Sequence, residues 1–269
     1  ERERRALYDE TGGNPLLLRW VVGQLALGRR RTIAEALAFL RSAPPGNNPL
    51  EFIFGDLLDV LSETEARVLA ALAHFTTPME PHFIAELASL NEAAASGALS
   101  DLVSRALVVP DLEERRFILV PMVADFVRRA RPDAVAETGT RLEQRAYALI
   151  VENGYEKHDR FPVLDAAWPT VAPALPLLVA GPNQRLQTVC DALDTFLNFT
   201  GRWDEWLSLD QQVEAKAVAA GDHRHAGWRA FQEGWVHYLR QQADAVLTCA
   251  DRAEAHWQNA QAGTRERAA

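Results

Sequence analysis

Cysteine, lysine and long apolar runs are scarce in this chain of 269 residues. Its two cysteines, Cys190 and Cys249, are too few for a disulfide framework, which favours a reducing cytoplasm, and both lie on apolar helical faces that predict a core position. No apolar run approaches the roughly 18 residues of a transmembrane helix, so we expect no membrane partner. The net charge of −9 argues against broad binding of nucleic-acid phosphates.

Motifs of enzyme sites are also missing. The sequence has no G-x-x-x-x-G-K-[ST] phosphate loop, no H-E-x-x-H and no C-x-x-C. Serine, histidine and aspartate occur without the context of a nucleophile elbow. His223 and His225 have no third metal ligand close in sequence, and we interpret them as part of a solvated loop. We therefore expect no catalytic residue, no metal ligand and no cofactor bound by this chain alone.

The two ends of the sequence have the pattern of an excised segment. The charged residues from Glu1 to Arg5 are not followed by the apolar core of a signal peptide. A helical pattern is still running from Thr264 to Ala269. We expect a longer parent protein in which a helical array continues after Ala269 and covers the last predicted helix.

Residues 1–48 are predicted to form three helices. Gly12 and Gly13 favour a turn, and Pro15 opens the second helix at a position where its missing N–H costs nothing. Thr32 is a candidate N-cap for the third helix. Proline and glycine then dominate the segment from Ser42 to Pro49, which predicts a linker and a domain boundary.

Residues 49–131 combine helices with a β-hairpin. Ser62 and Glu65 form a capping box. The hydrophobic period drops to two in the runs Leu107–Val109 and Phe117–Val120, which predicts two strands. The three helices nearest before the hairpin, the hairpin itself and one helix after it are in the order of a winged-helix domain. The predicted helices are 50–61, 63–75, 83–88, 91–106 and 122–129.

Residues 132–269 are predicted to be helical. Three prolines between Leu164 and Leu178 predict a kinked or broken helix. The stretch Phe199–Leu207 can be laid over Leu239–Leu247, and a helical repeat with a period of about 40 residues is typical of an α-solenoid. The predicted helices are 139–151, 186–199, 203–220, 224–239 and 243–261.

An aromatic stripe runs along the predicted helix 224–239. Trp228, Phe231, Trp235 and Tyr238 recur at helical spacing. Core packing and a ligand-binding surface both agree with such a stripe, and we favour core packing.

The segment Tyr8–Leu18, with the sequence YDETGGNPLLL, resembles the lid-domain motif of STAND-class signal-transducing ATPases, which include NB-ARC proteins. In that family a winged helix follows the lid, and tetratricopeptide-like (TPR-like) arrays follow in many members. Val163–Pro169 and Phe199–Trp203 resemble the start of such an array. The resemblance implies a mainly α chain, with a lid-like segment at 1–48, a winged-helix domain at 49–131 and a helical region leading into TPR-like repeats at 132–269.

The resemblance also assigns a role to Gly13, Asn14 and Pro15. In the family this element opens the lid helix, and its proline lies against the bound nucleotide. ATP or ADP, with Mg, would be held by an N-terminal ATPase domain that this chain does not contain. Many NB-ARC proteins carry a Met-His-Asp triplet where this chain has Val120, Pro121 and Met122. Because Pro121 offers no donor to a phosphate, the resemblance does not extend to ADP sensing by the winged helix.

The implied function is the regulatory and interaction region of a nucleotide switch, acting in signal sensing and conformational switching, with defence or transcriptional regulation as its setting. The repeats would bind a protein partner or signal, and the intact protein could form a nucleotide-dependent oligomer. An alternative is a stand-alone TPR-like scaffold or adaptor without an ATPase. A DNA-binding transcription factor is disfavoured, because the candidate recognition helix 91–106 carries Glu92, Asp101 and Arg105, net −1.

Overall fold

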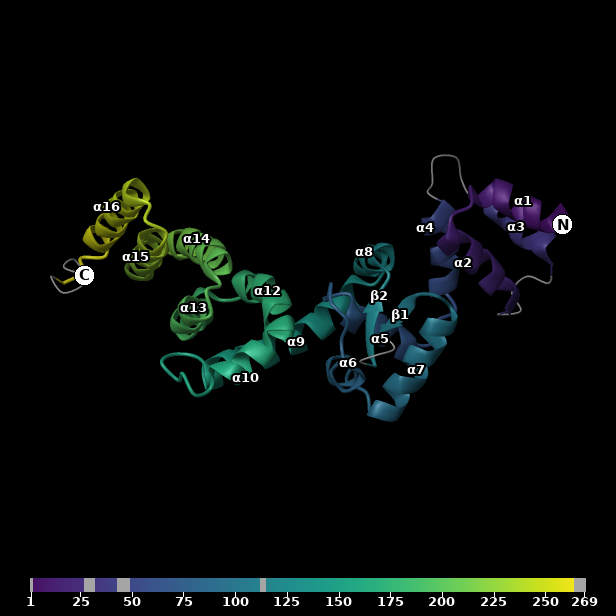
Figure 1. Cartoon of the computed structure of the whole chain (residues 1–269), viewed down its shortest axis with the longest axis horizontal. Coiled ribbons are helices and arrows are strands. Elements are labelled where there is room, and N and C mark those ends of the chain that lie inside the picture. Colours follow the sequence, from purple (N-terminus) through teal and green to yellow (C-terminus); the bar gives the residue numbers. More distant parts are fainter. Residues whose placement is uncertain (1, 27–31, 43–48, 112–114, 264–269) are drawn as a thin grey trace. The chain divides into compact units, whose positions relative to one another are not determined.

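The computed structural model describes residues 2–26, 32–42, 49–111 and 115–263. Within these ranges the chain is mainly helical, with one two-stranded antiparallel sheet, as predicted (Figure 1). It separates into two compact units, Glu1–Arg141 and Leu142–Ala269, and the boundary falls inside helix α9 (Pro132–Asn153). Among the described helices none combines the length and the hydropathy needed to cross a membrane. The predicted linker includes residues 43–48, which lie outside the described ranges.

Four helices open the first unit. Trp20 in the second of them is buried, and its ring centroid lies 5.3 Å from that of Phe54 in the fourth. The indole Nε1 of Trp20 donates a hydrogen bond of 3.4 Å to the carbonyl of Ala106. Trp20 therefore joins the second helix to the fourth and to the backbone at Ala106. The four helices are α1 (Arg2–Thr11), α2 (Pro15–Ala26), α3 (Ile33–Arg41) and α4 (Pro49–Leu58).

Two helix caps predicted in this unit, at Thr32 and Ser62, are present. The hydroxyl of Thr32 accepts from the backbone N–H of Glu35 at 3.1 Å. The hydroxyl of Ser62 accepts from the backbone N–H of Glu65 at 3.2 Å, and the Glu65 carboxylate accepts from the backbone N–H of Ser62 at 2.7 Å. These bonds satisfy donors that would otherwise be unpaired at the helix start, and the capping box is confirmed.

The rest of the first unit contains three helices, the hairpin and a further helix, in the predicted order. The strands pair antiparallel, with Val108 opposite Leu119. Met79 adds a backbone bridge to Phe117, with two hydrogen bonds of 2.8 Å, which the sequence did not predict. The elements are α5 (Glu63–Leu72), α6 (Pro81–Ala88), α7 (Glu92–Ser104), β1 (Val108–Asp111), β2 (Arg116–Leu119) and α8 (Pro121–Ala130).

Several predicted helix boundaries are wrong. Helix α4 ends at Leu58 rather than residue 61, and α5 ends at Leu72 rather than residue 75. Helix α9 begins at Pro132 rather than residue 139. Apolar periodicity locates the buried face of a helix but not its last turn, and a proline fits the first turn even where no apolar residue marks it.

In the second unit, the proline-rich segment is divided into short pieces, as predicted. Each piece has a proline at its first or second position, where the missing N–H is tolerated. A single helix through the segment would place these prolines in its interior, where each would remove a hydrogen bond. The pieces are α10 (Phe161–Ala166), α11 (Trp168–Val171), the 3₁₀ turn η1 (Ala172–Ala174) and α12 (Leu175–Ala180).

Four helices of equal length follow, and they confirm the predicted repeat. They begin at residues 183, 203, 223 and 243, so the first pair recurs in the second pair at the predicted offset. Left-handed residues recur with it: Gly201 matches Gln241, and Gly221 matches Gln261, with φ between 51° and 70°. The helices are α13 (Asn183–Phe199), α14 (Trp203–Ala219), α15 (His223–Leu239) and α16 (Ala243–Asn259). Cys190 and Cys249 are buried in them as free thiols, as predicted.

Candidate functional site

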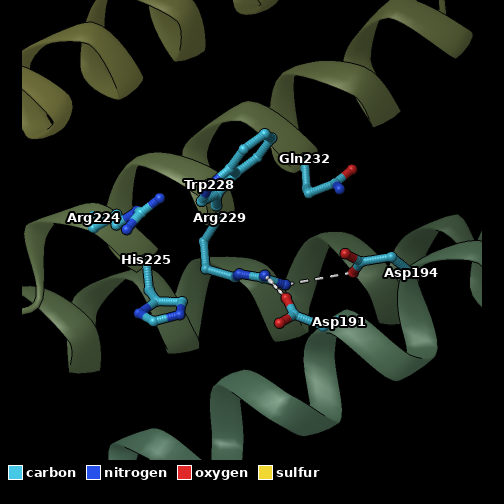
Figure 2. A pocket seen from close by; sticks show the side chains of 7 residues that line it. All are labelled: Asp191, Asp194, Arg224, His225, Trp228, Arg229 and Gln232. Atoms are coloured by element: carbon cyan, nitrogen blue, oxygen red, sulfur yellow. Dashed lines mark hydrogen bonds and ion pairs between the residues drawn. The ribbon is translucent and has the colours of Figure 1, made fainter. Parts of the chain in front are cut away.

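A polar pocket opens between the first helices of the two repeats, α13 and α15. Its volume is about 330 Å³. Figure 2 shows Arg229 extending from α15 toward two carboxylates of α13, with His225 and Arg224 on one side and Gln232 on the other. Its lining residues are Asp191, Asp194, Arg224, His225, Trp228, Arg229 and Gln232.

The pocket is organised around one buried cation. The side chain of Arg229 is 2% exposed, and its guanidinium forms an ion pair with the half-exposed Asp191. It lies 3.5 Å from an oxygen of Asp194 and 3.5 Å from an oxygen of the fully buried Asp210 of α14. A buried charge is tolerated only where partners compensate for lost hydration, and here three carboxyl groups surround one guanidinium. Arg229 therefore joins α15 to both helices of the preceding repeat.

Two carboxyl groups of this cluster, those of Asp194 and Asp210, hold protons more strongly than ordinary aspartates. Burial raises the pKa of Asp194 to about 6; Arg229 opposes this shift, and the nearby Asp191 carboxylate supports it. Burial and the Asp194 carboxylate raise the pKa of Asp210 well above its usual range. Burial lowers the pKa of the Arg229 guanidinium, but the carboxylates outweigh that effect and raise it, so this group stays charged. The pocket thus combines a permanent cation with titratable carboxyls.

The raised pKa of Asp194 predicts a pH-dependent stability. An unfolded Asp194 ionises near pH 4, whereas the folded one keeps its proton to about pH 6. Folding therefore binds a proton between these values, so stability is highest below the window and falls as pH rises through it. The variant Asp194→Asn should flatten this slope and exceed the parent in stability by about 1–3 kcal/mol at pH 7.5. Denaturant unfolding of the parent and the variant at several pH values measures both the slope and the difference in stability.

Asp204→Asn is the matched control, because Asp204 is exposed and its pair with Arg240 lies at the surface. This variant should change stability by less than about 1 kcal/mol. A lower stability of Asp194→Asn than of the parent at pH 7.5 would mean that the Asp194 carboxylate stabilises the fold as a partner of Arg229, and it would contradict the raised pKa.

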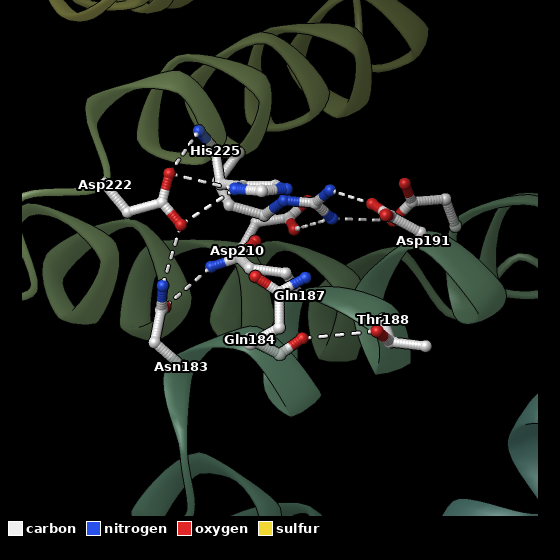
Figure 3. A network of polar contacts seen from close by, with 10 residues as sticks. Asn183, Gln184, Gln187, Thr188, Asp191, Asp210, Asp222 and His225 are labelled. Atoms are coloured by element: carbon white, nitrogen blue, oxygen red, sulfur yellow. Dashed lines mark hydrogen bonds and ion pairs between the residues drawn. The ribbon is translucent and has the colours of Figure 1, made fainter. Parts of the chain in front are cut away.

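A chain of hydrogen bonds joins Gln187 and Asn183 of α13 to Asp222 and His225 at the start of α15 (Figure 3). Asp222 caps α15, and both its oxygens lie 2.8–2.9 Å from His225 Nδ1. The amide of Asn183 donates to Asp222 at 2.8 Å, and Gln187 donates to Asn183 at 3.0 Å. Although burial acts against ionisation, the bonds to His225 outweigh it and lower the pKa of Asp222. The Asp222 carboxylate thus holds the His225 imidazole at the start of α15.

Two sequence interpretations in this region are wrong. His223 and His225 begin α15 instead of lying in a solvated loop, because Asp222 caps the helix just before them. The aromatic stripe is not all core: Trp235 and Tyr238 are 42% and 62% exposed. Their exposed rings border an apolar groove of about 380 Å³ between α15 and α16, while Trp228 and Phe231 are half-buried against Trp257.

The turn at Gly13, Asn14 and Pro15 is held by local bonds. Gly13 has φ +70°, and a Cβ there would lie 2.7 Å from the ring of Tyr8. The side-chain oxygen of Asn14 accepts from the backbone N–H of Leu17 at 3.1 Å, which caps α2. Asn14 and Pro15 are exposed at the start of this helix. The structure therefore presents these residues at a surface, and their contact with a nucleotide stays a prediction.

The exposed face of α7 carries small and acidic residues. Glu92, Ser100 and Asp101 are exposed on it. Arg105, which follows α7, is turned to an ion pair of 3.0 Å with Glu65, so its charge is already compensated. Pro121 is the first residue of α8 and has no N–H to donate.

The cluster around Arg229 was not predicted from the sequence, although two of its charged residues lie on apolar helical faces. Asp210 follows Leu209 and precedes Val213 by three residues, so it lies on an apolar helical face. Arg229 likewise lies between Ala226 and Ala230. A charge on an apolar face predicts a buried partner, but helical spacing within one element cannot name a partner on another helix.

The fold of the chain is similar to that of a Signal Transduction ATPase with Numerous Domains (STAND) protein with a tetratricopeptide repeat sensor from Pyrococcus horikoshii. The crystal structure of that protein matches with a TM-score of 0.56 and 16% sequence identity. The match covers 92% of this chain and 31% of that protein, so the chain spans about a third of its length. At this identity the likeness is one of fold. No family model matches the sequence, and no curated protein matches it.

Proposed function

We propose that this chain is the regulatory and interaction region of a nucleotide-switched STAND ATPase. The observation that carries the proposal is the likeness of fold, over 92% of the chain, to a STAND protein with a repeat sensor. The order of elements supports a lid-like segment at 1–48, a winged-helix domain at 49–131 and a helical region leading into TPR-like repeats at 132–269. In the intact protein the lid-like segment and the winged-helix domain would move as the bound nucleotide changes between ATP and ADP. The repeats would bind the signal.

The turn at residues 13–15 suits the edge of a nucleotide site rather than a complete one. Pro15 offers an exposed apolar ring to a base or ribose, and Asn14 already uses its side-chain oxygen to cap α2. Neither residue carries a charge for a phosphate. ATP or ADP, with Mg, would therefore be held by a separate ATPase domain, and the chain alone would not be an enzyme.

We accordingly predict that the isolated chain neither binds nor hydrolyses ATP. One exposed proline removes too little apolar surface from water to hold a nucleotide, since micromolar binding requires about 8 kcal/mol. Titration calorimetry with ATP and Mg should show no heat beyond dilution. Micromolar binding by this chain would place a nucleotide site within it and contradict the assignment.

The pocket around Arg229 supports a recognition role for the repeats. A buried guanidinium, the half-exposed Asp191 and half-buried aromatic and amide side chains converge there. Such mixed pockets fix the orientation of a partner's polar group through a few placed contacts. A protein partner or signal on this surface is the proposed input of the switch.

We further predict that the chain does not bind duplex DNA. Residues 42–131 hold 13 acidic and 7 basic side chains, net −6, and the exposed face of α7 offers carboxylates where phosphates would lie. Fluorescence anisotropy of a labelled duplex in 50 mM salt should not change at sub-micromolar protein. Salt-sensitive binding in that range would contradict the prediction.

Hydrogen exchange of the full-length protein, with and without ADP, tests the proposal. We expect slower exchange in residues 11–20 when ADP is bound, because a closed lid protects the first turn of α2. The alternative, a scaffold or adaptor without an ATPase, is favoured by the exposed Trp235 and Tyr238, which suit a partner surface independent of nucleotide. It predicts no effect of ADP on these amides, and that result would support the alternative.

A further inference from the structure

Three different metal-ligating side chains meet between α15 and α16, away from the polar pocket. Glu233 and His237 lie one turn apart on α15, and Cys249 lies on α16. Their donor atoms all lie within 4.8 Å of one another, and the distance from His237 Nε2 to Glu233 Oε1 is 3.6 Å. Glu233 and Cys249 are buried, whereas His237 is half-buried and reaches solvent. The cluster therefore has an inner and an outer side.

The preceding repeat fills the same three positions with leucine. A shift back by one repeat takes Glu233 to Leu193, His237 to Leu197 and Cys249 to Leu209. All three leucines are buried. The helix pair thus packs with apolar side chains at these positions, and packing alone does not call for a carboxylate, an imidazole and a thiol.

A hydrogen bond orients His237 for ligation. Its Nδ1 lies 2.6 Å from the side-chain oxygen of Gln242, which can only accept, so Nδ1 carries the proton. In the neutral imidazole Nε2 then carries no proton, and it lies 3.6 Å from Glu233 Oε1. Metal-binding histidines are commonly held in this way, with the second nitrogen donating to an oxygen.

The net charge of the side chains around the cluster is negative, so a divalent cation would balance it. Arg252 bonds Glu214 with two hydrogen bonds of 2.9 and 3.0 Å and also pairs with Glu233. His256 contacts Glu214 at 3.2 Å. Two carboxylates against one guanidinium give −1; a thiolate would make this −2, which one divalent ion balances.

We propose that Glu233, His237 and Cys249 bind one Zn²⁺ ion that joins α15 to α16, with a fourth position open to water on the side of His237. Sulfur, imidazole nitrogen and carboxylate oxygen together are a donor set that zinc prefers. Tetrahedral zinc requires donors about 3.5 Å apart, so the cluster contracts by roughly 1 Å on binding. Binding forms a Zn–S bond and releases the Cys249 thiol proton to the buffer.

Calorimetry and cobalt spectroscopy on the tag-free chain test the proposal. Zn²⁺ should bind at one equivalent, with close to one proton released when the heat is compared across buffers. Co²⁺ should give a thiolate-to-cobalt charge-transfer band and the visible bands of a tetrahedral ion. The variants His237→Leu and Cys249→Leu, which copy the preceding repeat, should stay folded by circular dichroism and bind Zn²⁺ at least tenfold more weakly. Gln242→Ala should weaken binding about tenfold through the orientation of His237.

Cys190→Ala and His256→Gln are the controls, since they remove a buried thiol and a neighbouring imidazole outside the proposed ligand set. Both should keep the affinity and the cobalt spectrum. The proposal is overturned if the parent chain shows no stoichiometric Zn²⁺ binding, or if His237→Leu and Cys249→Leu bind as the parent does. It does not depend on the proposed nucleotide switch.

Discussion

The variant Arg229→Met should lower the free energy of unfolding by about 3–5 kcal/mol at pH 7, the range found when one partner of a buried ion pair is removed. Arg229 is the cation that faces Asp210, a carboxyl group with no exposed surface, and it also faces the mostly buried Asp194. Methionine fills much of the volume but leaves both carboxyls without a positive partner. They must then stay protonated or remain charged in an apolar environment, and either state costs free energy.

Two comparisons separate this charge effect from lost packing. Arg240→Met removes a more exposed guanidinium, paired with the exposed Asp204, and should cost less than about 1 kcal/mol. Adding Asp210→Leu to Arg229→Met should recover a large part of the loss, because buried ion pairs replaced by apolar groups are often neutral. Urea unfolding followed by circular dichroism gives all three values. An Arg229→Met chain as stable as the parent would mean that the cluster does not hold the repeats together.

The second large effect is expected at Trp257. Trp257→Ala should cost about 3–5 kcal/mol, as large-to-small changes of core aromatics do. This side chain is 4% exposed, and its ring centroid lies 5.5 Å from that of Trp228 and 6.2 Å from that of Phe231. Because Gly227 has no side chain, the Trp257 indole can lie against the backbone of α15. A Cβ at Gly227 would lie 2.3 Å from the indole nitrogen of Trp257. Trp257 therefore packs α16 against α15.

Trp235→Ala is the matched control for this prediction. Trp235 lies on the same helix pair but is 42% exposed, so its removal should cost about 1 kcal/mol or less. Thermal unfolding of both variants distinguishes the two tryptophans. Equal effects would indicate that the packing of Trp257 contributes little beyond that of a surface side chain.

The helices could be predicted from the sequence because their signals are local. The capping box at Ser62, the turn at Gly12 and Gly13 and the helical repeat each depend on residues close in sequence or on a fixed offset. The bridge between Met79 and Phe117 could not be predicted, because it joins backbone segments far apart in the sequence with no side-chain pattern to mark it.

The polar clusters were missed for a related reason. Arg229 meets Asp191 on a different helix, and Cys249 meets His237 only when α16 folds back on α15. Spacing within α15 shows that Glu233 and His237 share a face, but it cannot show which side chain of the next helix faces them. Comparison of the two repeats supplies what spacing lacks, because a polar residue at a leucine position is visible once the offset is known.

A substitution in the surface turn at residues 13–15 tests the proposed nucleotide contact directly. The variant Pro15→Glu should leave helix α2 intact, because an acidic side chain in the first turn is favoured by the helix dipole. It would place a negative charge where an anionic nucleotide is proposed to lie. Pro81→Glu makes the same change at the start of α6, away from that turn in sequence, and is the matched control.

The most direct measurement is the affinity of the full-length protein for ADP, in the parent and in these two variants. We predict that Pro15→Glu raises the Kd for ADP by about tenfold, a change of about 1.4 kcal/mol, and that Pro81→Glu leaves it within about twofold. Equal affinities in all three proteins, or no ADP binding by the parent, would contradict the assignment of this chain to a nucleotide switch.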